Sequence, residues 1–188
     1  MSELITRARY AYRGKLLKLR VARVTLPNGL KTTREIVEHR GAVAIIPLLD
    51  RRRVLVTKQY RIAAGRRLLE IPAGTLEPGE RPASCAKREL TEETGYAARR
   101  IRKAFSCYLA PGYSTEKIHF FLARDLIPTK AKQAEDEAIT VLAMELDDAI
   151  NAIERGKIQD AKTICALYYL TTHGKAGEHG GRRRASNV

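Results

Sequence analysis

Apolar and polar residues alternate along the first part of the chain, at the two-residue spacing of β-strands. The pattern runs through residues 15–25, meets a turn at Pro27-Asn28-Gly29 and resumes over 31–38. It predicts a small antiparallel unit over residues 10–39. Such a unit is too short to hold a core by itself, so we expect it to pack on the main domain or on a second subunit.

Two apolar, β-branched runs follow, over residues 42–49 and 54–59, with the polar segment 50–53 between them. We expect these runs to form a hairpin of buried strands. Shorter runs predict further strands, over 68–72, 104–109, 117–123 and 139–145. Residues 125–137 are mostly polar, which favours a loop.

Three later segments have the periodicity and the end signals of helices. They cover residues 83–94, 146–155 and 161–173, bounded by Pro82, Gly95, Asp160 and Gly174. Ala83, Ala86 and Leu90 give the first helix an apolar stripe, and Ile164, Leu167 and Leu170 give one to the last.

The order of these elements predicts an α/β or α+β fold, with a mixed sheet covered by helices. We expect an N-terminal β unit over residues 1–39, a main domain over 40–173 and a basic, disordered tail over 174–188.

Composition narrows the class of protein. The chain has 188 residues, 44% of them hydrophobic and 30% charged, which suits one globular domain. The longest apolar stretch, residues 41–49, is about half of the ~20 residues that a membrane-spanning helix needs, and the N-terminus lacks the apolar centre of a secretion signal. We therefore expect a cytoplasmic protein. The cysteines, Cys85, Cys107 and Cys165, are not spaced for zinc or for a disulfide framework, and we expect buried, reduced thiols.

The chain is strongly basic, with 35 Lys and Arg against 21 Asp and Glu and a net charge of +14. Its positive runs, at residues 51–53, 99–103 and 182–184, fall where we expect turns or the tail. Solvated loops would explain them. A basic surface also attracts nucleic acid, anionic lipid or phosphate compounds.

The first predicted helix contains the candidate catalytic and metal-binding residues. Glu89, Glu92 and Glu93 are spaced i, i+3 and i+4, so their carboxylates share one helix face and repel one another unless a cation lies among them. Oxygen ligands of this kind suit a hard ion such as Mg²⁺ or Mn²⁺. Arg88 could orient the carboxylates, and Glu80 could pair with Arg88. A solvated acidic helix face is the alternative.

The spacing of Gly74, Glu80, Arg88-Glu89-Leu90, Glu92-Glu93 and Gly95 resembles the signature of the Nudix hydrolases, with Tyr96 in its last, aliphatic slot. The resemblance implies the Nudix fold, in which a mixed sheet lies between helices. It also implies metal-dependent hydrolysis of a nucleoside diphosphate that is linked to another group.

Further stretches are similar to those of the ADP-ribose pyrophosphatases within that family. These are residues 34–36, 39–43, 59–61 and 70–74, together with Pro111. The resemblance then implies hydrolysis of ADP-ribose to AMP and ribose 5-phosphate. Other Nudix substrates, such as GDP-sugars, UDP-sugars or dinucleoside polyphosphates, and a nucleic-acid-binding module remain the alternatives.

The resemblance also implies roles for the residues of the signature. Glu89 and Glu93 would bind Mg²⁺ or Mn²⁺ with the carbonyl of Ala73, and Glu92 would be a further or water-bridged ligand. Gly74, Glu80, Arg88 and Gly95 would be structural. For the base that activates water we favour Glu137, with Glu135 second and an acidic solvated loop as the alternative.

For the substrate, the resemblance implies a homodimer with a shared active site. Arg34 and Glu35 of the N-terminal unit would bind the adenine end in the neighbouring subunit, unless Arg34 is a cross-strand charge. Arg61 would reach a phosphate, unless it is a surface arginine. Three residues after the predicted strand 104–109 complete the expected substrate site: Pro111, Tyr113 and Glu116. Packing is the alternative for Tyr113.

Overall fold

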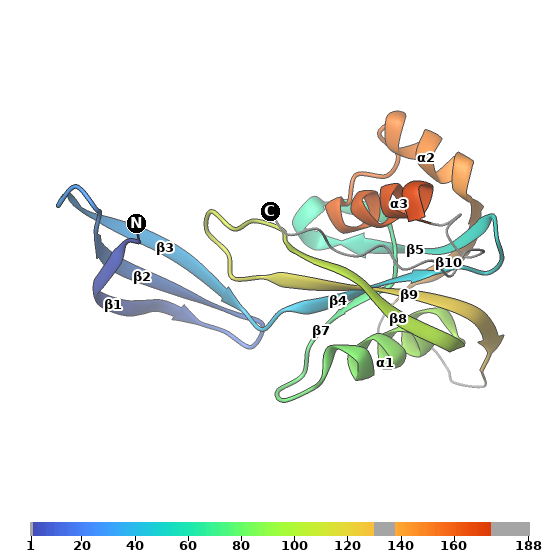
Figure 1. The fold of residues 1–188 in the computed structure, drawn as a ribbon, viewed down its shortest axis with the longest axis horizontal. Coiled ribbons are helices and arrows are strands. Elements are labelled where there is room, and N and C mark those ends of the chain that lie inside the picture. Colours follow the sequence, from blue (N-terminus) through green and yellow to red (C-terminus); the bar gives the residue numbers. More distant parts are fainter. Residues whose placement is uncertain (1, 130–137, 174–188) are drawn as a thin grey trace, which may run out of the picture.

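The computed structural model describes residues 2–129 and 138–173. Their strands form three sheets, and three α-helices pack around two of these sheets (Figure 1). No helix among the described residues combines the length and the apolarity needed to cross a membrane.

The N-terminal sheet is an antiparallel meander that projects from the rest of the molecule (Figure 1). It contains β1 (Leu4–Arg13), β2 (Leu17–Thr25) and β3 (Lys31–His39). The sequence predicts the second and third of these strands but not β1, because arginines interrupt the apolar pattern there. Every residue of β1 is exposed, so burial does not impose an alternating pattern on this strand.

The central sheet is mixed and has the strand order β7-β4-β9-β8. Its strands are β4 (Ala42–Pro47), β7 (Ala73–Thr75), β8 (Tyr96–Tyr108) and β9 (Lys117–Pro128). Strands β4 and β9 run parallel to each other. The outer strands are antiparallel to their neighbours, β7 to β4 and β8 to β9. Every residue of β4 is buried, which explains its continuous apolar run.

The third sheet is antiparallel, has the strand order β10-β5-β6 and lies beside the central one. Its strands are β5 (Arg53–Arg61), β6 (Arg66–Glu70) and β10 (Thr140–Glu145), and a 3₁₀ turn, η1 (Ile62–Ala64), joins the first two. The helices are α1 (Pro82–Thr94), α2 (Leu146–Glu154) and α3 (Ala161–His173).

The two faces of the central sheet have separate cores. Val43 and Ile45 of β4 pack with α1 on one face. Ala44 and Ile46 pack on the other face with β5, α2 and α3. Helix α1 thus lies on one side of the molecule and α2 with α3 on the opposite side (Figure 1). The prediction of a mixed sheet between helices is confirmed.

The predicted hairpin of residues 42–49 and 54–59 is wrong in one respect. The turn exists, and Asp50 closes it by accepting hydrogen bonds from the backbone N–H groups of Arg52 and Arg53, both at 2.8 Å. However, β4 and β5 belong to different sheets, and pairing is confined to the turn, with an isolated bridge between Leu48 and Val54 and a hydrogen bond from the Leu49 N–H to the Arg53 carbonyl at 2.9 Å. The edges of β4 are already occupied by β7 and β9.

Two strands extend beyond their predicted ranges. Residues 125–128, expected as loop, continue β9, and Asp125 adopts a left-handed φ of 55° there. Strand β8 starts at Tyr96 rather than near residue 104, so the basic run 99–103 lies inside a strand and not in a turn. The short strand β7 and the turn η1 have no counterpart among the predicted elements. The basic tail, 174–188, lies outside the described residues.

The helix predictions need smaller corrections. Asp160 caps α3 as expected, because its Oδ2 accepts a hydrogen bond from the Thr163 backbone N–H at 2.9 Å. In α1, Ala83 is exposed and Cys85 is buried in its place. All three cysteines are free, but only Cys85 is fully buried, since Cys107 is half-buried and Cys165 is exposed.

Candidate active site

Packing of α1 decides where its glutamates lie. Pro82 begins the helix, and Gly95 ends it with a φ of 72°, in the left-handed region that favours glycine. Cys85, Ala86 and Leu90 are buried against the central sheet. The carboxylates therefore occupy another part of the helix circumference, next to β7.

Arg88 joins the carboxylates of this region. Its Nε and Nη2 donate hydrogen bonds to the two oxygens of Glu80, both at 3.0 Å. Its Nη1 donates to Glu89 at 2.7 Å and to Glu92 at 2.9 Å. Glu80 also accepts a hydrogen bond from the Glu77 backbone N–H at 3.0 Å. The expected pairing of Glu80 with Arg88 is present, and it fastens the preceding loop to the helix.

These contacts set the protonation states. The hydrogen bonds from Arg88 lower the pKa of Glu80 to about 2, so Glu80 is a carboxylate at neutral pH. The same hydrogen bonds raise the pKa of Arg88 above its ordinary value. Burial, and then Glu80, raise the pKa of the Cys85 thiol to about 12. Cys85 is therefore no thiolate nucleophile at neutral pH.

Two of the glutamates meet the backbone of β7. A Cβ built on Gly74 would overlap the carboxyl group of Glu89, so only glycine leaves room for this side chain. Glu93 is 8% exposed, and its Oε2 accepts a hydrogen bond from the Ala73 backbone N–H at 3.2 Å. The carboxylates of Glu89 and Glu93 thus both lie against the β7 backbone, at Gly74 and at Ala73 respectively.

The donors at this point fit a hard divalent cation in their chemistry. Glu89, Glu92 and Glu93 offer carboxylate oxygens, and Ala73 offers a backbone carbonyl. Glu92 lies further out, with a side chain that is 48% exposed and bonded to Arg88. Within 2–129 and 138–173, no three acidic, His or Cys side chains are grouped as a metal cluster. Glu92 would have to move toward the other two to act as a direct ligand.

Arg61 has a carboxylate partner. Its Nε and Nη2 donate hydrogen bonds to Glu70 at 2.8 and 2.9 Å. Glu70 is 2% exposed and also forms an ion pair with Lys162. Burial by itself would raise the pKa of Glu70, but the hydrogen bonds and charges of Arg61 and Lys162 outweigh it and hold that pKa below its usual range. The expected phosphate contact of Arg61 stays a prediction.

The loop between β8 and β9 docks on β3. The Val37 backbone N–H donates to the Tyr113 carbonyl at 2.8 Å, and the Thr115 N–H donates to the Val37 carbonyl at 3.0 Å. The Thr115 hydroxyl adds a hydrogen bond from the His39 N–H at 3.0 Å and one to the His39 carbonyl at 3.2 Å. These bonds fix the loop that carries Pro111, Tyr113 and Glu116 to the N-terminal sheet.

The other expected substrate residues lie on or near that loop. Tyr113 is 61% exposed, so its ring is available to a ligand and is not buried by packing. Arg34 and Glu35 lie on β3, where Arg34 forms an ion pair with Glu3 at 2.7 Å. The hydrogen bond to Glu3 raises the pKa of Arg34. The partner of Arg34 within this chain is thus a carboxylate from the segment before β1.

Some features of this region are absent from the sequence predictions. The pairing of Glu70 with Arg61 and Lys162 and the bonds between His39 and Thr115 join residues far apart in the chain. No local pattern marks such pairs. The only available signal was the charge of Glu70 within the otherwise apolar predicted strand 68–72. Glu135 and Glu137, the candidate bases, lie outside the described residues.

Comparisons with known proteins agree with this geometry. The NUDIX domain model matches residues 38–167. An ADP-ribose pyrophosphatase of Bacillus subtilis is 43% identical over 161 residues, 85% of this chain and 87% of the relative. A methanol dehydrogenase activator of Bacillus methanolicus is 40% identical over 163 residues, with the same shares covered.

More distant proteins extend the comparison. A GDP-mannose pyrophosphatase of Citrobacter koseri is 35% identical over 159 residues, 78% of this chain and 83% of the relative. A crystal structure described as an ADP compounds hydrolase matches with a TM-score of 0.84 and 23% identity, covering 95% of this chain and 97% of that one. At that identity it supports the fold alone.

Proposed function

Since this chain belongs to the Nudix hydrolase family, we propose that it hydrolyses the diphosphate of ADP-ribose, with AMP and ribose 5-phosphate as products. The observation that carries the proposal is the placement of Glu89 and Glu93 against the β7 backbone at Gly74 and Ala73. The similarity to the ADP-ribose pyrophosphatase of Bacillus subtilis supports the substrate.

Nudix hydrolases generally need a divalent metal ion, and we propose Mg²⁺, with Mn²⁺ as a substitute. Glu89 and Glu93, the Ala73 carbonyl and, after a small movement, Glu92 would hold it. When bound, such an ion neutralises phosphate oxygens and lowers the pKa of water. Arg88 keeps the acidic face together, because its positive charge reduces the repulsion between carboxylates.

A glutamate after β9 would take the proton from the attacking water. We favour Glu137, with Glu135 as the second candidate. Glu137→Gln should lower kcat by about 100-fold or more, whereas Glu135→Gln should change it by less than about threefold. Measured kcat values decide between them, and the reverse order would transfer the role to Glu135.

For the substrate we propose contacts from Arg61, Pro111, Tyr113 and Glu116 of one subunit. Arg34 and Glu35 of a second subunit would bind the adenine end across a homodimer. The exposed ring supports a substrate contact from Tyr113. The cytoplasmic location expected from the sequence stays a prediction.

The main alternative has the same mechanism but a substrate with a different nucleobase or sugar. The similarity to a GDP-mannose pyrophosphatase supports nucleotide-sugars other than ADP-ribose as substrates. A nucleic-acid-binding module without catalysis is disfavoured, because the carboxylates of the signature are all present.

Product analysis tests the proposal. The protein is incubated with ADP-ribose, GDP-mannose, UDP-glucose and diadenosine polyphosphates, each with Mg²⁺ and with a chelator, beside Glu93→Gln. We expect AMP and ribose 5-phosphate from ADP-ribose, with loss of turnover in chelator and a fall of about 100-fold or more in Glu93→Gln. Faster turnover of GDP-mannose would make GDP-mannose the preferred substrate. If none of these compounds is hydrolysed, the proposal is contradicted.

A further inference from the structure

A run of cations lies on the outer strand of the central sheet. Residues 99–103 carry four basic side chains within β8, and only Ile101 among them packs toward α1. Strand β8 is the last strand of the sheet in the order β7-β4-β9-β8. These cations therefore line the edge of the sheet instead of occupying the turn that the sequence predicts.

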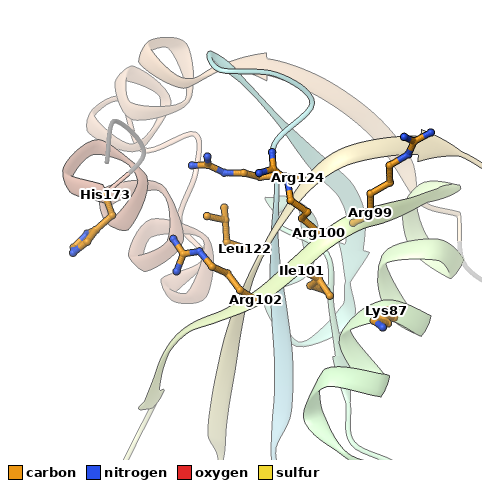
Figure 2. A pocket seen from close by; sticks show the side chains of 9 residues that line it. Lys87, Arg99, Arg100, Ile101, Arg102, Leu122, Arg124 and His173 are labelled. Atoms are coloured by element: carbon orange, nitrogen blue, oxygen red, sulfur yellow. The ribbon is translucent and has the colours of Figure 1, made fainter. Parts of the chain in front are cut away.

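The run borders a hollow of about 540 Å³ to which four elements contribute. Figure 2 shows Arg100 and Arg102 of β8 together with Arg124 of β9, while His173 comes from α3 and Lys87 from α1. Arg99, Ala98, Ile101 and Leu122 complete the lining. None of the described residues that line the hollow is acidic.

The strand register places like charges opposite each other there. Arg100 pairs with Arg124 across β8 and β9, an arrangement that destabilises a sheet unless the charges are neutralised. Asp125 accepts hydrogen bonds from Arg100, and these bonds, followed by the positive charges of Arg100, Arg99 and Arg124, hold the pKa of Asp125 below its usual range. The carboxylate of Asp125 thus faces three arginine side chains. A bound anion would further lower the repulsion between these arginines.

The hollow is separate from the carboxylates of the proposed active site. Lys87 lies at least about 120° around α1 from Glu89, Glu92 and Glu93, at about 100° per residue. Those glutamates meet β7, and β8 lies at the opposite edge, three strand spacings or about 14 Å away.

We infer that this hollow binds a small, multiply charged phosphate compound of the inorganic oligophosphate class. Arginine guanidinium groups match phosphate oxygens in paired hydrogen bonds. The volume is that of a small-ligand site, and the lining residues include no Phe, Tyr or Trp ring on which nucleic-acid bases could stack in series.

Protection of an edge strand from aggregation would explain cations on β8 alone. It does not explain why Arg124 of β9 and His173 of α3 border the same hollow. Arg100, Arg102, Arg124 and His173, from β8, β9 and α3, lie on the side of the sheet that α3 covers. This grouping of basic side chains from separate elements points to a ligand.

Calorimetric titration of the full chain with inorganic tripolyphosphate, in chelator and moderate salt, tests the inference. We expect one binding event that Arg100→Gln with Arg102→Gln weakens by about tenfold or more, since each lost charged hydrogen bond has an effect of that order. Arg51→Gln with Arg52→Gln removes the same charge from the exposed β4–β5 turn and should change the affinity by less than about twofold. Glu93→Gln, in the proposed active site, should bind as the wild type does.

Other results would overturn the inference. These are absence of binding, equal weakening in both double variants, or binding that depends on Glu93. Tighter binding of a single-stranded oligonucleotide of about 20 nucleotides, lost in Arg100→Gln with Arg102→Gln, would instead make the surface a nucleic-acid site. If that double variant does not fold, the exposed Arg102→Gln alone replaces it, and unchanged affinity there would also contradict the inference.

Discussion

At the scale of single residues, Arg88 holds together the region that we propose as the active site. It donates two hydrogen bonds to Glu80 before the helix and one each to Glu89 and Glu92 on it. Because the guanidinium is planar and always charged, lysine could not make these contacts together. Arg88 is thus a positioning residue for carboxylates that would bind metal.

Gly74→Ala should weaken Mn²⁺ binding by about tenfold or more. The added Cβ occupies the place of the Glu89 carboxyl group, which must move away from the β7 backbone. Titration followed by Mn²⁺ electron paramagnetic resonance measures this change without reference to substrate.

Gly112→Ala is the matched control for that variant. A Cβ at Gly112 meets no atom within 4 Å, so Mn²⁺ affinity should stay that of the wild type. Unchanged Mn²⁺ binding in Gly74→Ala would remove Glu89 from the proposed ligand set.

Glu80 should stabilise the fold in a pH-dependent way. Its pKa falls from 4.5 to about 2 on folding, so its stabilising effect is fully present above about pH 4.5 and is lost as the pH falls toward 2. The free energy of unfolding of Glu80→Gln should lie about 2 kcal/mol below that of the wild type at neutral pH. Urea unfolding at a series of pH values should show this difference closing between pH 4.5 and 2.

The exposed Glu77 of the same loop provides the comparison, and Glu77→Gln should change the free energy of unfolding by less than about 0.5 kcal/mol. A difference between Glu80→Gln and the wild type that stays constant down to pH 2 would show that Arg88 does not lower the pKa of Glu80.

At the scale of elements, the contact between the β8–β9 loop and β3 links the N-terminal sheet to the main domain. Two backbone hydrogen bonds at Val37 and two hydrogen bonds of the Thr115 hydroxyl form it. The position of Tyr113, and so of part of the proposed substrate site, depends on this contact.

Thr115→Val should therefore raise KM for ADP-ribose about three- to fivefold and leave kcat within about twofold. The hydroxyl holds the loop in place but does not belong to the proposed metal site. Steady-state kinetics measures both constants, and Thr171→Val, which removes an exposed hydroxyl from α3, should change neither. A fall in kcat alone would contradict this role.

The elements also show how far the sequence predicts the structure. Helix α1 and the buried strand β4 were predicted because periodicity and capping residues act locally. The sequence did not predict the strand that pairs with β4, because β9 lies far along the chain and no local pattern specifies this pairing. In the proposed site, the contact of Glu80 with Arg88 was anticipated from spacing, whereas the room that Gly74 leaves for Glu89 becomes visible only in three dimensions.

At the scale of the whole molecule, the exposed strand β1 forms the free edge of the N-terminal sheet. Large apolar side chains on it are open to solvent, namely Leu4, Ile5, Tyr10 and Tyr12. Such an edge is suited to contact with a second copy of the chain, as the proposed shared active site requires.

Sedimentation equilibrium should therefore give twice the chain mass of 21.1 kDa. Ile5→Glu with Tyr12→Glu should lower the apparent mass toward that of one chain, because burying two carboxylates in an interface is unfavourable. Ile62→Glu changes an exposed apolar residue of η1 and should leave the mass unchanged. A single-chain mass for the wild type at all concentrations would contradict the dimer.

The parallel pairing of β4 with β9 has a consequence for synthesis of the chain. The N-terminal meander pairs only consecutive strands, so all of its strands are available to one another once residue 39 has left the ribosome. Strand β4 emerges next, yet its partner on one edge ends only at Pro128 and the helix that covers one of its faces spans Pro82–Thr94. The most apolar strand of the protein thus waits, uncovered, for most of the remaining chain, the interval in which a chaperone would have most to protect.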